Sequence, residues 1–81
     1  MPFFYVYILT DIVTQSHHYT GFTTDLQERL ARHNRGAVPT TASLRPWIIQ
    51  TAMAFDSEGK ARAFETYLKS HSGRVFAEKH L

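Results

Sequence analysis

One segment, residues 19–36 (YTGFTTDLQERLARHNRG), constrains the fold most because it holds both the end of a strand and a complete helix. Residues 19–22 are typical of a strand. A capping-box pattern, in which Ser or Thr is followed three residues later by Glu or Gln, begins at Thr24 and predicts a helix over about 25–35. Gly36 supplies the left-handed residue that commonly ends a helix. The chain therefore passes from sheet to helix within a few residues.

Two polar residues lie on the predicted inward side of this helix. At ~100° per residue, Leu26 and Leu30 define the buried stripe, His33 falls between their directions, and Arg29 lies about 60° to one side. Arg32 points the other way. Because unpaired buried charge is costly, Arg29 and His33 must meet partners, water or a ligand.

The remaining elements follow from periodicity and turn residues. Alternation in the first apolar run places Val6 and Ile8 on one face of a strand and Tyr7 and Leu9 on the other. In chain order we predict a strand over 3–10, a hairpin loop over 11–17, a strand over 18–22, the helix over 25–35, an irregular loop over 36–46, a strand over 47–55, a helix over 58–69 capped by Asp56 or Ser57 and ended by Ser72-Gly73, and a short helix over 74–80.

Composition narrows the class of protein. Eighty-one residues that are 43% hydrophobic and 20% charged predict one globular domain over residues 1–81. A net charge of +2 is compatible with a nucleic-acid partner without establishing one. The absence of cysteine excludes disulfides, thiolate metal sites and cysteine nucleophiles. With no bilayer-length apolar run and no secretory signal, we expect a cytoplasmic protein with no membrane partner.

The predicted helix over 58–69 also carries a polar residue beside its apolar stripe. Ala61, Phe64 and Leu68 form that stripe, and Glu65 lies at its edge, about 40° from Ala61. No other acidic residue of the chain has such a position. Glu65 is therefore a candidate ligand for a hard cation such as Mg²⁺ or Mn²⁺.

Phosphodiester hydrolysis would use Tyr7, Tyr19, Arg29, His33 and Glu65 together. A guanidinium stabilises charge on phosphate oxygens, a carboxylate holds the cation, and a base takes a proton from the attacking water. His33 has the suitable pKa, whereas a tyrosine with a pKa near 10 needs a cation or Arg29 beside it, and the choice of base is open.

Each of these residues also has a structural explanation. Glu65 and Lys69 make an ordinary i, i+4 helix pair, and Arg29 can lay its stem on apolar surface with its head in water. His33 can be a hydrogen-bonded core histidine, and the tyrosines can simply pack in the sheet. These explanations stay open.

The ordered pattern of these residues resembles the GIY-YIG endonuclease family, in particular its small stand-alone bacterial members. The pattern consists of Tyr5-Val6-Tyr7, Tyr19-Thr20-Gly21, Arg29, His33 and a helical Glu65. The resemblance runs from Tyr5 to about Lys69. It implies an α+β fold with a three-stranded antiparallel sheet flanked by helices, and a single divalent metal at Glu65.

The resemblance also implies roles for single residues. Tyr7 and Tyr19 match the two motif tyrosines of the family, Arg29 its phosphate-binding arginine, and His33 a histidine of some branches. The chain departs from the family pattern in two places. The first motif reads Tyr-Val-Tyr and not Gly-Ile-Tyr, and Glu65 is not followed by the asparagine that some branches carry after the metal ligand.

We therefore predict a metal-dependent DNA endonuclease that prefers single-stranded or locally unpaired DNA. Mg²⁺ or Mn²⁺ is the expected cofactor. The alternative is a non-catalytic nucleic-acid-binding module of the same fold, in which Arg74 adds to the basic contacts. The candidate nucleic-acid contacts are Arg29, Arg32, Arg35, Arg45, Trp47, as a stacking face, and Lys69.

Overall fold

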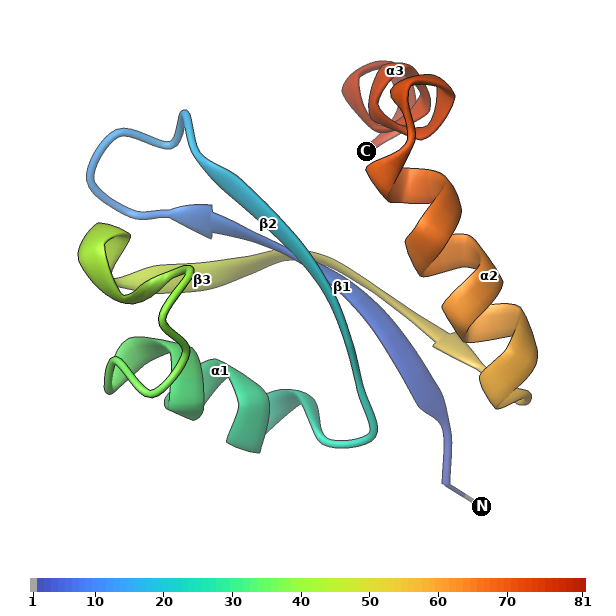
Figure 1. Cartoon of the computed structure of the whole chain (residues 1–81), viewed down its shortest axis with the longest axis horizontal. Coiled ribbons are helices and arrows are strands. Elements are labelled where there is room, and N and C mark those ends of the chain that lie inside the picture. The colour runs from blue at the N-terminus through green and yellow to red at the C-terminus, as the bar shows by residue number, and fades with distance from the viewer. Residues whose placement is uncertain (1) are drawn as a thin grey trace.

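A computed structural model describes residues 2–81. Three strands form one antiparallel sheet in the order β2-β1-β3, with helices on both faces (Figure 1). This is the expected α+β fold. The elements are β1 (Phe4–Asp11), β2 (His18–Thr23), α1 (Leu26–Asn34), the 3-10 turn η1 (Ala42–Leu44), β3 (Trp47–Phe55), α2 (Glu58–Lys69) and α3 (His71–His80). Within the described residues, no helix is long and apolar enough to cross a membrane.

The alternation of β1 divides the apolar side chains into two clusters. Val6 and Ile8 pack with Leu68 of α2 on one face of the sheet. Tyr7 and Leu9 lie on the opposite face, in the cluster that the leucines of α1 join. The alternation predicted for β1 is therefore confirmed, and the sheet separates α1 from α2.

The start of α1 differs by one residue from the prediction. The N-cap is Asp25 and not Thr24, because the Asp25 carboxylate accepts a hydrogen bond from the Glu28 backbone N–H at 3.1 Å. Both positions carry a residue that can cap a helix, and the sequence pattern alone does not choose between them. Gly36 has the predicted positive φ, +80°, directly after the end of the helix.

The boundary between α2 and α3 is a second correction. Ser70, and not Ser72-Gly73, separates the two helices: it ends α2, and its hydroxyl accepts from the Gly73 N–H at 3.2 Å to cap α3. Gly73 lies in the first turn of α3, where a Cβ would overlap the backbone carbonyl of Tyr67. The glycine therefore permits close approach of two helices and does not stop one.

Candidate functional site

The site is built where Tyr7 of β1 crosses β2. Tyr7 pairs with Gly21 in the sheet register, and a Cβ on Gly21 would overlap the Tyr7 hydroxyl. The missing side chain thus gives the phenol room to lie across β2. Tyr19, on the same strand as Gly21, lies beside Tyr7, and the centroids of the two rings are 6.4 Å apart.

His33 of α1 is buried and hydrogen-bonded at both ring nitrogens. Nε2 is 3.0 Å from the Tyr7 hydroxyl, and Nδ1 is 2.7 Å from the Thr41 hydroxyl oxygen. Because the Thr41 hydroxyl donates to the Val38 carbonyl at 3.3 Å, its oxygen accepts from Nδ1–H. This network assigns the tautomer in which the bare Nε2 accepts the phenol proton.

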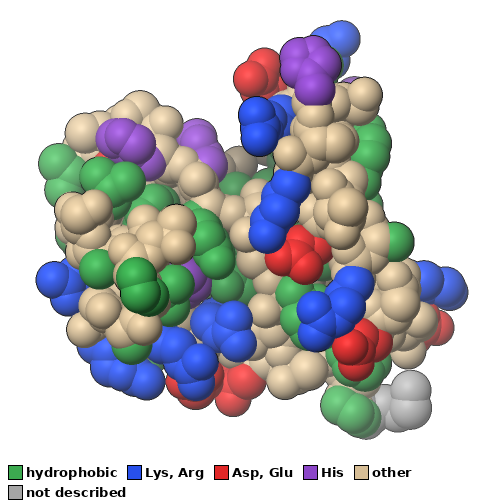
Figure 2. All heavy atoms as spheres, in the orientation of Figure 1, with side chains coloured by type: hydrophobic (Ala, Val, Ile, Leu, Met, Phe, Trp, Pro, Cys, Tyr) green, Lys and Arg blue, Asp and Glu red, His purple; other side chains and the backbone are tan. Residues whose placement is uncertain are grey.

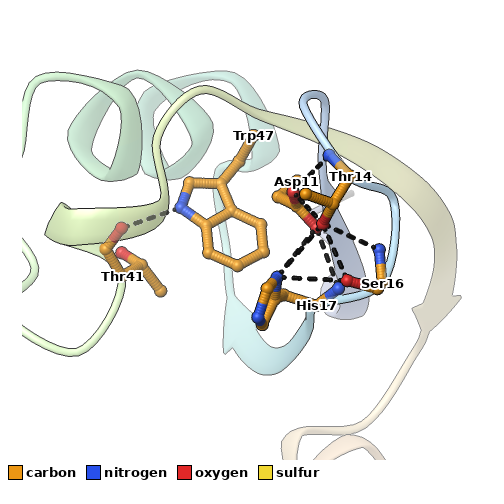
Figure 3. A network of polar contacts seen from close by, with 6 residues as sticks. All are labelled: Asp11, Thr14, Ser16, His17, Thr41 and Trp47. Atoms are coloured by element: carbon orange, nitrogen blue, oxygen red, sulfur yellow. Dashed lines mark hydrogen bonds and ion pairs between the residues drawn. The ribbon is translucent and has the colours of Figure 1, made fainter.

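Thr41 is a site residue that sequence reasoning missed. It is buried, and its carbonyl accepts a hydrogen bond from the Trp47 indole N–H at 2.9 Å (Figure 3). The Asn34 side chain in turn bonds the Trp47 backbone N–H and C=O at 2.7 and 3.0 Å, which ties the end of α1 to the start of β3. A threonine inside an irregular loop gives no sequence signal for such a contact.

The electrostatics of the site keep the proton on the phenol at rest. Burial raises the pKa of Tyr7 to about 12; the Arg29 guanidinium lowers it, while Tyr19 and Glu65 raise it further. Burial also lowers the pKa of His33, and the charges of Arg29 and Arg32 lower it more. At neutral pH His33 is therefore an uncharged acceptor facing a protonated phenol.

Arg29 has donors to spare at this site. Its Nη1 donates to the Phe22 carbonyl of β2 at 3.3 Å, and its buried Nε has no hydrogen-bond partner within residues 2–81. A buried donor without a partner is costly, and a guanidinium can satisfy several donors on one anion. The arrangement suits an oxyanion such as a phosphate.

Glu65 is a carboxylate whose charge acts on Tyr7, and it fits a single hard cation. Its side chain is 18% exposed, and Lys69 binds Oε2 at 3.0 Å, which leaves Oε1 for another partner. Nowhere in residues 2–81 do three histidine, cysteine or acidic side chains gather as a metal cluster. Mg²⁺ often takes one or two carboxylates and completes its shell with waters and substrate phosphate, so one glutamate suffices.

The chain is similar to known proteins over most of its length. The family model of the GIY-YIG catalytic domain matches residues 3–79. The chain belongs to the GIY-YIG family. A UPF0213 protein of Halobacterium salinarum is 38% identical over 56 residues, which cover 68% of this chain and 73% of that protein. Membership of a nuclease family makes nucleic acid the substrate class.

The GIY-YIG fold brings together Tyr7, Tyr19, Arg29 and His33, with Glu65 close enough to influence the pKa of Tyr7. The guanidinium groups of the other candidate arginines have different neighbours, although the charge of Arg32 still acts on His33. Arg32 and Arg35 pair with Glu28 at 3.3 and 3.7 Å, and the Arg45 guanidinium lies against Gly36. Lys69, by contrast, is next to the site through its bond to Glu65.

The predicted stacking role of Trp47 is contradicted by its burial. The indole is 2% exposed and packs with Tyr7 and Leu9 beneath α1. A base cannot stack on a ring that is enclosed by the core. Residue type and strand position favour the alternative, a core tryptophan, and the burial agrees with it.

A second polar cluster, at the tip of the β1–β2 hairpin, is structural. The buried Asp11 carboxylate accepts from the Thr14 N–H, the Thr14 hydroxyl and the His17 N–H at 2.7–2.8 Å (Figure 3). Burial alone would raise the pKa of Asp11, but these hydrogen bonds hold it well below its usual range. The Asp11 carboxylate and the Ser16 hydroxyl both lie near the same ring nitrogen of His17, Nδ1. In a hydrolase triad the histidine contacts the serine and the aspartate through different nitrogens, so this cluster is not a triad.

Proposed function

We propose that this GIY-YIG protein is an endonuclease that requires Mg²⁺ or Mn²⁺, hydrolyses DNA phosphodiester bonds and prefers single-stranded or locally unpaired DNA. The observation that carries the proposal is the hydrogen bond from the Tyr7 phenol to the bare Nε2 of His33. A buried, neutral acceptor aimed at a phenol is what a tyrosine needs to act as a base.

The proton path follows the hydrogen bond between the Tyr7 hydroxyl and Nε2 of His33. The attacking water forms the new P–O bond while its proton moves to the Tyr7 oxygen and the phenol proton moves to Nε2 of His33. The bond from phosphorus to the leaving oxygen breaks, and solvent protonates that oxygen. His33 acts through Tyr7, because both its nitrogens are bonded and its ring is buried.

Arg29 and Glu65 supply the electrostatics in this proposal. The guanidinium of the half-buried Arg29, in which Nη1 bonds the Phe22 carbonyl, binds the oxygens of the reacting phosphate, where charge grows in the transition state. Glu65 holds the cation, which when bound adds charge stabilisation at the same phosphate. Tyr19, whose ring meets the His33 ring edge-on at 4.9 Å, helps to hold His33 in place.

The preference for unpaired DNA is supported by the depth and the charge of the site. Tyr7 is only 2% exposed, so a phosphate must bend inward to reach it. Single strands bend readily, whereas duplex DNA is stiff over about 150 base pairs. On the face in Figure 2, basic side chains gather at the lower left with acidic ones beside them, and the two kinds are interspersed on the right; the net charge is only +2, so a broad duplex contact has little support.

One observation favours a second candidate function. The Glu65–Lys69 ion pair is an ordinary helix pair, and a protein in which Glu65 served that pair alone would bind nucleic acid without cutting. Arg29 and Lys69 would then serve binding alone.

Matched single-stranded, duplex and branched DNA oligonucleotides, incubated with Mg²⁺ or with EDTA, test the proposal. We expect cleavage only with the metal, and faster cleavage of unpaired DNA. Binding without cleavage would establish the second candidate. Equal or faster cutting of the duplex at moderate salt would refute the preference.

A further inference from the structure

A groove of about 600 Å³ lies between the sheet and the helices α2 and α3, on the sheet face opposite α1. Ile8 of β1, Leu68 of α2 and Ala77 of α3 give it an apolar lining. Figure 2 shows a hollow in this region, between the body of the protein and the arm formed by α2 and α3. Its volume is that of a site for a small molecule or a single nucleotide.

The border of the groove carries two basic groups with donors to spare. Lys69 binds Glu65 with one of its three ammonium donors, which leaves two. Arg74 is exposed, and within residues 2–81 its guanidinium has no carboxylate at ion-pair distance. Gln50 and Glu78 add hydrogen-bonding groups to the lining. Apolar walls beside the spare donors of Lys69 and Arg74 match a flat base joined to a phosphate.

The groove adjoins the proposed reaction centre, because Tyr19 lines the groove and also lies beside Tyr7. Lys69 lines the groove and is bound to Glu65, one helical turn (about 5.4 Å) earlier on α2. A strand whose phosphate reacts near Glu65 can therefore continue past Lys69 into the groove.

We propose that this groove binds one unpaired nucleotide of the substrate strand, adjacent to the reacting phosphate. The base lies against Ile8, Leu68 and Ala77, and the neighbouring phosphate contacts Lys69 and Arg74. Glu78 and Gln50 can hydrogen-bond the edge of the base. Only an unstacked base can enter, so the groove selects single strands. This inference rests on the proposed function for its substrate.

Binding of a short labelled single strand, measured in EDTA by fluorescence anisotropy, tests the charge at the border. We expect Arg74→Ala to weaken binding about tenfold, as loss of a charge-assisted contact does. For Arg74→Ala, the slope of the logarithm of the binding constant against the logarithm of the salt concentration should fall in magnitude by about 0.7. Lys79→Ala is the matched control, because Lys79 is on the same helix but does not line the groove. Its binding should change less than twofold.

Oligonucleotides with one abasic position test the base contact. Removing a single base at the position that the groove holds should weaken binding, whereas the same change farther along the strand should not. Equal binding by all abasic strands, or equal effects of Arg74→Ala and Lys79→Ala, would overturn the groove assignment. Free thymidine monophosphate that binds as tightly as the strand would overturn its assignment to a strand. Because these measurements need no cleavage, they separate failure of the groove from failure of the nuclease proposal.

Discussion

The His33 imidazole is held at both nitrogens, and this restraint decides what it can do. Thr41→Val keeps the shape of the side chain but removes the acceptor for Nδ1–H, which leaves a buried donor unpaired at a cost of about 1–3 kcal/mol. The ring then favours the tautomer with hydrogen on Nε2, which cannot accept the Tyr7 proton. We expect kcat to fall roughly 100-fold, within the range of general base catalysis.

Nitrogen chemical shifts of His33 separate this effect from simple loss of packing. Thr41→Val should move the ring hydrogen from Nδ1 to Nε2, and Thr41→Ser, which restores the hydroxyl, should return both the tautomer and kcat. A Thr41→Val protein with the wild-type tautomer and wild-type kcat would show that Thr41 only fills space.

The pH dependence of cleavage tests the same imidazole. His33 must be neutral to accept a proton, and burial together with Arg29 and Arg32 lowers its pKa from the ordinary 6.5. The rate should therefore rise with pH through a midpoint below 6.5 and be level at neutral pH, since protonated His33 is inactive. A midpoint above 6.5 in the profile of kcat/KM would contradict the assigned base.

At the scale of elements, α1 presents two faces with different tasks. Arg29 faces the sheet, with Nη1 on the Phe22 carbonyl, whereas Arg32 pairs with Glu28 on the outer side. Arg29→Lys keeps the charge but loses the fork of donors, so kcat should fall roughly 10²–10³-fold. Arg32→Lys should change it less than about twofold. Equal losses in single-turnover cleavage would show that surface charge, and not a site, matters.

The sequence predicts most of these elements because each follows a local rule. Alternation identified the faces of β1, and the 3.6-residue period placed Arg29 and His33 toward the sheet. Local rules failed where one residue type has two uses. Asp25 competes with Thr24 as the cap of α1, and Gly73 permits a close helix contact although glycine also ends helices.

At the scale of the molecule, the features that the sequence does not reveal are tertiary contacts. Thr41 reaches His33 from a loop without regular structure, and Trp47 is buried only because α1 covers it. Neither contact has a periodicity that sequence reasoning can detect. The groove between β1, α2 and α3 lies where the chain turns from α2 into α3. That turn is at Ser70, whereas the sequence predicts it at Ser72-Gly73.

The proposed hydrolysis requires that Glu65 bind a cation and not only pair with Lys69. Glu65→Gln preserves the size of the side chain and removes its charge, and Glu58→Gln is the matched control on the same helix, where Glu58 pairs with Arg62 at 2.8 Å.

The most direct measurement is single-turnover cleavage of single-stranded DNA in Mg²⁺ by the wild type and these two variants, with folding checked by circular dichroism. The account predicts that Glu65→Gln loses roughly 100-fold or more in rate while its DNA binding in EDTA stays within a few-fold of the wild type. It predicts that Glu58→Gln cuts at nearly the wild-type rate. Near wild-type, Mg²⁺-dependent cleavage by folded Glu65→Gln would contradict it.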